Sequence, residues 1–368
     1  MRVLAFGTYD VKAHPRVQVL IDGLREHGLP VSEIVEPLGL STAQRVSFLQ
    51  NPSSLPRFVG RLLGRWGALA GRAVRLRGAQ RPTHVLVGYL GHFDVLLARL
   101  LFPRAQIVLD HLIFAAGTAR DRGAGDGLRT RLLGLLDRLA LGAADVIVVD
   151  TPEHRELVPA RRRGSAVVVP VGATSSWFEA GAGAPEREGG SALSVVFFGL
   201  FTPLQGTQVV GEALRLLHDR GVEVRATLVG SGQDSDAVHA RVDGLPGVTW
   251  HSWVDGGELP ALVASHDVCL GIFGTTAKAL NVVPNKVYQG AAAGCAVVTS
   301  DTEPQRRALG DDAVLVTPGD AEALAGALAA LAADPATLAD VRRAGAGRAR
   351  ERFTARAVTA PLVEVLAR

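Results

Sequence analysis

Short runs of apolar residues alternate with longer amphipathic stretches along the chain. In the first half the apolar runs cover residues 3–7, 84–89, 106–110, 145–150 and 166–171. Stretches of helical length, such as residues 15–27 and 127–141, lie between them. Uninterrupted apolar runs separated by helices are typical of parallel strands that are covered on both faces. The first half is therefore predicted to be a doubly wound α/β sheet.

The same pattern restarts after a polar, glycine-rich stretch, EAGAGAPEREGGS, which is predicted to be a linker. Apolar runs follow at residues 193–198, 223–229, 248–252, 267–273, 295–300 and 313–316, with helices predicted at 206–220, 259–265, 284–293 and 321–332. We expect an N-terminal domain over residues 1–178, a linker over 179–192 and a C-terminal domain over 193–352. A last helix within 353–368 is expected to pack back on the first domain. Two Rossmann-like domains facing a cleft are the predicted architecture.

Composition narrows the class of protein. A chain of 368 residues with 48% apolar and 20% charged residues is typical of a globular protein with two domains. The net charge of +3 is too small to indicate nucleic acid as a partner. Cys269 and Cys295 lie in apolar surroundings without metal-ligand spacing, and are expected to be buried free thiols. With neither a signal peptide nor a transmembrane run in the sequence, we expect a cytoplasmic location.

Lysine is rare enough here to be informative, because only three of the 39 Lys and Arg residues are lysines. Lys286 lies in VVPNKVYQGAAAGCAVV, directly after Pro284, which suits the first turn of a helix. Free amides at a helix start, with the helix dipole, favour an anion. Lys278 precedes the same helix, and Lys12 follows the first strand of the other half. Phosphate is the simplest ligand for such a group, although isolated surface lysines are the alternative.

Beyond Lys286, the segment resembles the donor-binding signature of retaining glycosyltransferases of family 4, which have the GT-B fold. FFGLFTPLQGTQVVGEAL is similar to the phosphate-contacting strand, loop and helix of that family, and LVGSGQ to its next strand end. VTWHSWVDGGELPALVASHDVCLGIFG resembles the segment that holds the nucleobase. These motifs occur in the order of the family and cover nearly all of the second half. The first half resembles the family more weakly.

The resemblance implies that a nucleoside diphosphate sugar binds the second domain as a co-substrate, with no other cofactor. Gly199 and Gly206 would let the backbone approach the diphosphate, Lys286 would contact phosphate, and Trp253 with Val254 would hold the base. Gln289 would reach the ribose hydroxyls, although a capped or solvated glutamine is the alternative. Further donor-binding residues are expected at Thr202, Gln205, Gly230, Asn281, Pro284 and Asn285.

The chain departs from the common family pattern at four positions. Leu200 and Gln205 stand where many members have Arg and Lys, while Asn281 and Gln289 stand where many have two glutamates. We expect Lys278 and Lys286 to supply the charge that the first pair lacks, so both are placed among the catalytic residues.

The strand ends of the first half carry polar residues. In the family a histidine after one of these strands contacts the donor sugar, and here the match falls on Asp110 or His111. Thr8, Tyr9, Arg16 and His92 are predicted to bind the acceptor, which could be a small molecule, a lipid carrier or a polysaccharide. Helix caps and turns are the alternative for single polar residues at such sites. No metal site is predicted, because fixed positive charge could stabilise the leaving diphosphate.

One basic segment bears on location. Residues 37–93 contain eight arginines and no acidic residue. Within residues 57–77, five arginines share one helical face and Phe58, Leu62, Trp66 and Leu69 another. Such a helix could contact an anionic membrane or pack on the sheet with a solvated arginine face, although its glycines weaken the helix prediction.

The sequence thus favours a metal-independent glycosyltransferase that moves a sugar, with UDP as the favoured nucleotide, to an acceptor hydroxyl with retention of configuration. One alternative is a GT-B nucleotide-sugar epimerase, which would need acid and base carboxylates where Asn281 and Gln289 stand. The other is a non-catalytic nucleotide- or sugar-binding protein, which the uncharged Leu200 and Gln205 would suit.

Overall fold

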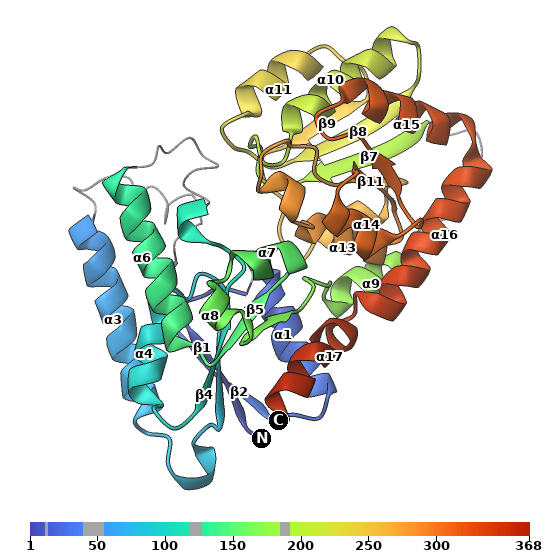
Figure 1. Cartoon of the computed structure of the whole chain (residues 1–368). Coiled ribbons are helices and arrows are strands. Elements are labelled where there is room, and N and C mark those ends of the chain that lie inside the picture. The colour runs from blue at the N-terminus through green and yellow to red at the C-terminus, as the bar shows by residue number, and fades with distance from the viewer. Residues whose placement is uncertain (12–13, 40–54, 118–126, 185–191) are drawn as a thin grey trace. The chain divides into compact units, whose positions relative to one another are not determined.

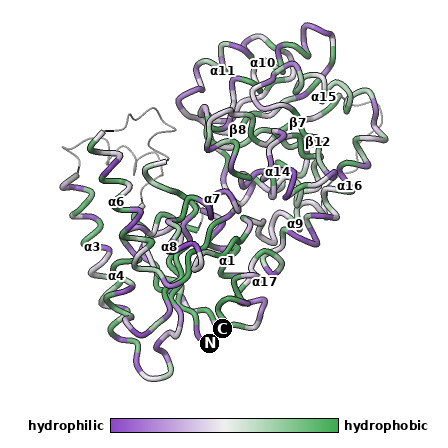
Figure 2. The backbone as a smooth tube through the Cα atoms, viewed as in Figure 1, coloured by the Kyte–Doolittle hydropathy of each residue, from purple (hydrophilic) through white to green (hydrophobic). Residues whose placement is uncertain are grey.

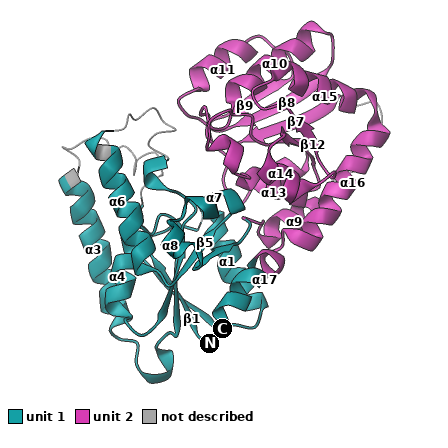
Figure 3. Cartoon of the chain, in the orientation of Figure 1, with its two compact units in different colours: residues 1–170, 359–368 teal, residues 171–358 magenta. Residues whose placement is uncertain are grey.

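The computed structural model describes residues 1–11, 14–39, 55–117, 127–184 and 192–368. The chain forms two compact units, residues 1–170 with 359–368, and residues 171–358 (Figure 3). Each unit contains one parallel six-stranded sheet with helices on both faces (Figure 1). The predicted α/β class and the two doubly wound domains are confirmed.

The first sheet has the strand order β2-β1-β3-β4-β5-β6. Its strands are β1 (Val3–Gly7), β2 (Val31–Val35), β3 (His84–Val87), β4 (Gln106–Asp110), β5 (Val146–Val149) and β6 (Ala166–Val168). Five of them agree with the apolar runs of the sequence. Strand β2 was not predicted, because it lies at the sheet edge and exposes Ser32 and Glu33 instead of forming an apolar run.

The helices of unit 1 form two layers. One face of the sheet packs against α3 (Leu55–Ala73), α4 (Asp94–Leu101) and α6 (Leu128–Ala143) in a single apolar cluster. The other face packs against α1 (Pro15–Glu26) and, through Leu362 and Leu366, against α17 (Ala355–Leu366). Shorter helices are α7 (Pro152–Leu157), α8 (Ala160–Arg163) and the 3-10 turn η2 (Gly78–Gln80). The end of α17 thus completes the core of the first unit.

The second sheet has the order β12-β11-β10-β7-β8-β9. Its strands are β7 (Leu193–Phe198), β8 (Val224–Val229), β9 (Val248–His251), β10 (Val268–Leu270), β11 (Ala296–Ser300) and β12 (Val314–Val316). Its longer helices are α9 (Ser175–Ala182), α10 (Thr207–Asp219), α11 (Ser235–Val242), α13 (Asn285–Ala292), α15 (Ala321–Ala333) and α16 (Pro335–Arg352). The rest are α12 (Leu259–Ala264), η3 (Ala279–Asn281) and α14 (Glu303–Leu309).

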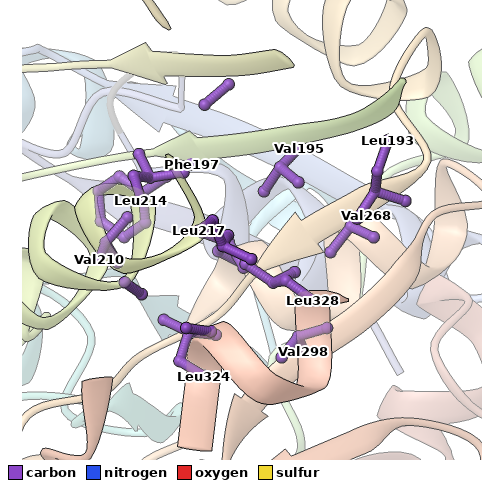
Figure 4. Close-up of a cluster of buried hydrophobic side chains, with 14 of the residues drawn as sticks. Leu193, Val195, Phe197, Val210, Leu214, Leu217, Val268, Val298, Leu324 and Leu328 are labelled. Carbon is purple, nitrogen blue, oxygen red and sulfur yellow. The ribbon is translucent and has the colours of Figure 1, made fainter. Parts of the chain in front are cut away.

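The core of unit 2 lies between one face of this sheet and helices α10, α11 and α15. Figure 4 shows Val195 and Phe197 of β7 in this cluster, with Leu214 of α10 and Leu324 of α15. The hydropathy view shows hydrophobic residues concentrated along the strands (Figure 2). Cys269 and Cys295 are buried free thiols, as predicted.

The expected linker needs a correction at its start. Residues 179–182 are not linker but the end of helix α9. Trp177 of this helix stacks on Phe198 at 5.6 Å between ring centroids, which attaches α9 to the second sheet. Residues 171–178, which the sequence assigned to the first domain, therefore lie in unit 2.

The helices also bear on membrane crossing. No single described helix is long and apolar enough to cross a membrane. The helical segments Ala321–Ala333 and Pro335–Leu366 have the length and apolar composition of a membrane span only when they are counted together, and the chain bends sharply between them.

Candidate active site

The topology of the second sheet defines one position for a ligand. From β7 the chain continues outward through β8 and β9, and β10 then pairs with the other side of β7. The strand order therefore reverses between β7 and β10. In open parallel sheets, ligands bind at the carboxyl ends of the strands beside such a reversal. The loops that leave this point are residues 199–206 and 271–284.

Glycines let these two loops and the loop that follows β8 approach one another through their backbones. A Cβ atom on Gly230 would lie 1.9 Å from the carbonyl oxygen of Gly199, and one on Gly206 would lie 2.4 Å from the carbonyl carbon of Phe273. Gly230 also has a φ of 130° and Gly206 a left-handed φ of 65°. There is no room for a side chain at either position. The surface at these strand ends is therefore formed by the backbone of the loops and not by side chains.

Lys286 projects from α13 to the end of β7. Its Nζ lies 3.5 Å from the centroid of the Phe197 ring, and 3.3 Å from the position that a Cβ on Gly199 would take. The side chain is 5% exposed, and its amine has no hydrogen-bond partner among the described residues. Burial lowers the pKa of Lys286 to about 7. An uncompensated amine at the carboxyl end of β7 is a ready partner for an anion.

Two helices of unit 2 begin in the loops that leave this strand-order reversal. Helix α10 begins after Gly206, and α13 begins at Asn285. Pro284 is the residue before α13 and not part of its first turn, because its ψ of 155° is extended. The correction leaves the amides of Asn285 and Lys286 at the start of the helix, where they and the helix dipole favour negative charge.

The other predicted donor residues occupy varied environments. Trp253 is 80% exposed, whereas Gln289 is 6% exposed within α13. Thr202, Gln205 and Val254 are half-buried, and the buried Oε1 of Gln205 has no hydrogen-bond partner in the described chain. The amide of Asn281 donates to the carbonyl of Ala277 at 2.8 Å. Lys278 precedes η3 on the same loop, and Lys12 lies outside the described residues. Their donor-binding roles stay predictions.

In unit 1, Asp110 and Arg16 form a buried ion pair. Arg16 Nε donates to Asp110 Oδ1 at 2.8 Å, and Arg16 Nη2 donates to the carbonyl of Val169 at 3.0 Å. The two side chains are 2% and 0% exposed. Burial raises the pKa of Asp110, and the guanidinium opposes this shift. The pair joins α1 to the end of β4, so the charge of each residue is balanced within the fold.

His111 belongs to a second buried cluster with His92 and Asp137. Asp137 Oδ1 lies 3.0 Å from His92 Nε2 and 3.9 Å from His111 Nε2, and accepts the Ala115 amide at 2.9 Å. Burial lowers the pKa of His111 to about 3, so its imidazole is neutral. Burial works to raise the pKa of Asp137, but the hydrogen bond with His92, the nearby imidazoles and the Ala115 amide together outweigh it, so this pKa is lowered. The three ligand atoms are also close enough to hold a metal ion. Sequence reasoning missed Asp137.

The end of β1 is likewise filled by the chain itself. The Thr8 amide and hydroxyl donate to Asp94 Oδ2 at 2.7 Å and 2.8 Å. Tyr9 is 1% exposed and lies against Gly88, where an added Cβ would be 2.7 Å from its ring. Burial raises the pKa of Tyr9. These contacts give Thr8, Tyr9 and Arg16 structural roles, and their part in acceptor binding stays a prediction.

Comparisons with known proteins agree with this geometry. Residues 192–334 match the family model described as "Glycosyl transferases group 1". The match covers the second sheet and most of the helices of unit 2, including α13, which carries Lys286. A search among curated protein sequences found no significant match.

Solved structures resemble the whole chain. Sucrose-phosphate synthase from Thermosynechococcus elongatus has a TM-score of 0.71 at 15% identity, with 100% of this chain and 98% of that chain covered. Anabaena HepE in complex with UDP-glucose has a TM-score of 0.68 at 15% identity, covering 100% and 99%. An α,α-trehalose-phosphate synthase (UDP-forming) from Burkholderia vietnamiensis has 0.68 at 14%, covering 100% and 96%.

The chain therefore has the GT-B fold of two Rossmann-like domains, as predicted. The family match and the shared fold support the prediction that it is an enzyme of the glycosyltransferase class.

Proposed function

We propose that the chain is a retaining glycosyltransferase similar to family 4. It moves a sugar from a nucleoside diphosphate sugar to an acceptor hydroxyl. The observation that supports this most is the buried amine of Lys286 at the β7 and β10 strand ends, which has no hydrogen-bond partner among the described residues. A buried charge without a partner costs stability, so a position that keeps one is expected to serve a ligand.

The diphosphate is proposed to lie over Gly199, between the starts of α10 and α13. Backbone amides there can donate to phosphate oxygens, and the ammonium of Lys286 can neutralise their charge. Lys278, on the same loop, is proposed to add a second charge in place of those missing at Leu200 and Gln205. UDP is the favoured nucleotide, because solved relatives of this fold are described with UDP and UDP-glucose. The exposed Trp253 is proposed to stack on the base.

Transfer needs the diphosphate to be stabilised as it leaves. The ammonium that Lys286 carries once diphosphate is bound, with the helix amides, can supply that stabilisation, which is the basis for proposing a metal-independent reaction. The family resemblance suggests that the leaving phosphate accepts the proton of the acceptor hydroxyl, with retention of configuration. No further catalytic base is needed for this step.

Calorimetric titration with UDP, GDP, dTDP and ADP tests the proposal. We expect one nucleotide to bind, and Lys286→Met to weaken it by about 1.5–3 kcal/mol, the range for a hydrogen bond to a charged group. The exposed Arg343→Met is the control for loss of a positive charge and should not change affinity. Absence of binding to all four nucleotides would contradict the proposal.

Incubation of UDP-sugars without acceptor separates transfer from epimerisation. Proton NMR should show the sugar configuration unchanged in the intact donor. A new epimer of the UDP-sugar would favour the epimerase. Binding of UDP-sugar without transfer to any acceptor hydroxyl would favour a binding protein.

A further inference from the structure

Helix α6 exposes a line of leucines. Leu128, Leu132, Leu135 and Leu139 are 75%, 57%, 48% and 51% exposed. Their spacing of four, three and four residues places them on one side of the helix. The buried residues Leu133, Asp137, Ala140 and Leu141 lie on the opposite side. Helix α6 therefore has two apolar sides, and only one of them faces the core.

Helix α3 contributes to the same face of unit 1. It packs with α4 and α6 into one apolar cluster on one side of the sheet, so the outer sides of the three helices form a common layer. Phe58, Leu62 and Leu69 of α3 are buried, so of the two alternatives for this side of the helix the structure shows packing within unit 1. Val59 and Leu63 are 42% and 57% exposed, on the flank of α3 opposite the one that carries its arginines. Figure 2 shows hydrophobic and hydrophilic residues interleaved along α3 and α6.

The exposed charged side chains of helices α3, α4 and α6 are all positive. Helices α3, α4 and α6 contain two acidic residues, Asp94 and Asp137, and both are buried. Their exposed arginines include Arg57, Arg61, Arg72, Arg131 and Arg138. Glu36 of the neighbouring loop pairs with Arg72 at 2.9 Å, and among the described residues no acidic side chain pairs with Arg57, Arg61, Arg131 or Arg138. Arg131 and Arg138 lie beside the exposed leucines of α6, and arginines beside exposed leucines are the combination that binds an anionic bilayer surface.

We propose that the outer layer formed by α3, α4 and α6, called the basic–leucine face, docks on the surface of an anionic lipid bilayer. The leucines of α6 enter the interface between headgroups and acyl chains, and the arginines contact lipid phosphates. A second copy of the chain fits this face less well. A two-fold interface would bring the arginines of this face near the arginines of the copy, where like charges repel.

The test is co-flotation of the full chain with vesicles of phosphatidylcholine alone or with about 30% phosphatidylglycerol, a content chosen to give a negative surface. We expect binding only to the anionic vesicles, and a loss of binding in 0.5 M salt at about a 3 to 5 Å screening length. The double variant L132Q/L139Q should lower the partition coefficient about tenfold or more, because two leucines no longer enter the apolar interface. Arg138→Gln should lower it by less.

Leu157→Gln is the matched control, because Leu157 of α7 is 57% exposed, as Leu132 is, but lies outside the layer. Its partition coefficient should equal that of the wild type. No binding to anionic vesicles, or an equal loss in Leu157→Gln, would overturn the proposal. So would a dimer in light scattering that L132Q/L139Q converts to a monomer, since this would assign the face to a second copy. Vesicle binding needs no nucleotide, so its outcome is independent of the proposed transferase function.

Discussion

The two units have similar sheets but differ in how charged side chains are paired at the point where the strand order reverses. In unit 1, the strand ends near the reversal between β1 and β3 are occupied by the chain's own side chains, with Arg16 bonded to Asp110 and Asp94 accepting from Thr8. In unit 2, the reversal between β7 and β10 is lined by glycine backbone, and the amine of Lys286 lies over the Phe197 ring with no hydrogen-bond or ion-pair partner in the described chain. The comparison indicates that unit 2 keeps its charge for a ligand, whereas unit 1 uses charge to hold its own fold.

The largest expected effect is a loss of stability on breaking the buried ion pair between Arg16 and Asp110. Asp110→Ala leaves the Arg16 guanidinium buried without its carboxylate, and should lower the free energy of unfolding by about 3–5 kcal/mol. Chemical denaturation followed by circular dichroism measures this loss. Asp340→Ala removes a carboxylate from a pair with Arg343 whose side chains are 71% and 75% exposed, and should change nothing measurable. Equal effects of the two substitutions would contradict the structural role of the buried pair.

The next largest effect on stability is expected where the loop backbones of unit 2 meet. Gly230→Ala should lower the free energy of unfolding by about 3 kcal/mol, because its Cβ meets the Gly199 oxygen in addition to the strain of a positive φ. Gly244→Ala isolates the strain, since Gly244 has a φ of 71° and no atom within 4 Å of the added Cβ. Its cost should be about 1 kcal/mol. Similar losses at both glycines would show that the loops do not touch as described.

At Lys286 we expect the opposite, a gain in stability on substitution. Without nucleotide, Lys286→Met should raise the free energy of unfolding by about 1–2 kcal/mol at pH 7, because it removes the cost of a buried, unpartnered amine. The folded-state pKa of about 7 lies below the unfolded value of 10.5. The stability of the wild type should therefore rise with pH between these values, and the advantage of methionine should disappear above pH 10.5. Denaturation of both proteins at pH 7, 9 and 10.5 measures this trend, and a loss of stability in the variant at pH 7 would contradict it.

Much of the fold follows from local sequence pattern, and its exceptions have physical causes. Strands β1, β4 and β7 match their apolar runs, because buried parallel strands need uninterrupted apolar residues. The edge strand β2 lacks such a run. The glycines of α3 weakened the helix prediction, and the helix is held by the packing of Phe58, Leu62 and Leu69 instead.

The candidate site was predictable in part. The rarity of lysine singled out Lys286, whereas its position against Phe197 depends on how α13 packs beside β7 and no local pattern gives it. Asp137 was missed because it joins its partners His92 and His111 only through the tertiary fold. One signal was available, since Asp137 shares a helical side with the apolar residues Leu133, Ala140 and Leu141. An acidic residue on an apolar side indicates a buried partner.

The exposed leucines of α6 are a feature that the sequence shows but does not explain. Their spacing is visible in the sequence, but leucines at helical spacing usually face the core. The structure separates the two apolar sides of this helix and shows which one is left uncovered.

Proton uptake on UDP binding tests the central claim most directly. An amine with a pKa of about 7 in the free protein is mostly neutral at pH 8, and a bound diphosphate should raise that pKa and protonate it. Calorimetry at pH 8 in two buffers of different ionisation enthalpy should give an uptake approaching about one proton in the wild type and none in Lys286→Met. Affinity should then fall as pH rises above 7. UDP binding without proton uptake, or with the same uptake in the variant, would contradict the claim that unit 2 holds Lys286 uncompensated for the diphosphate.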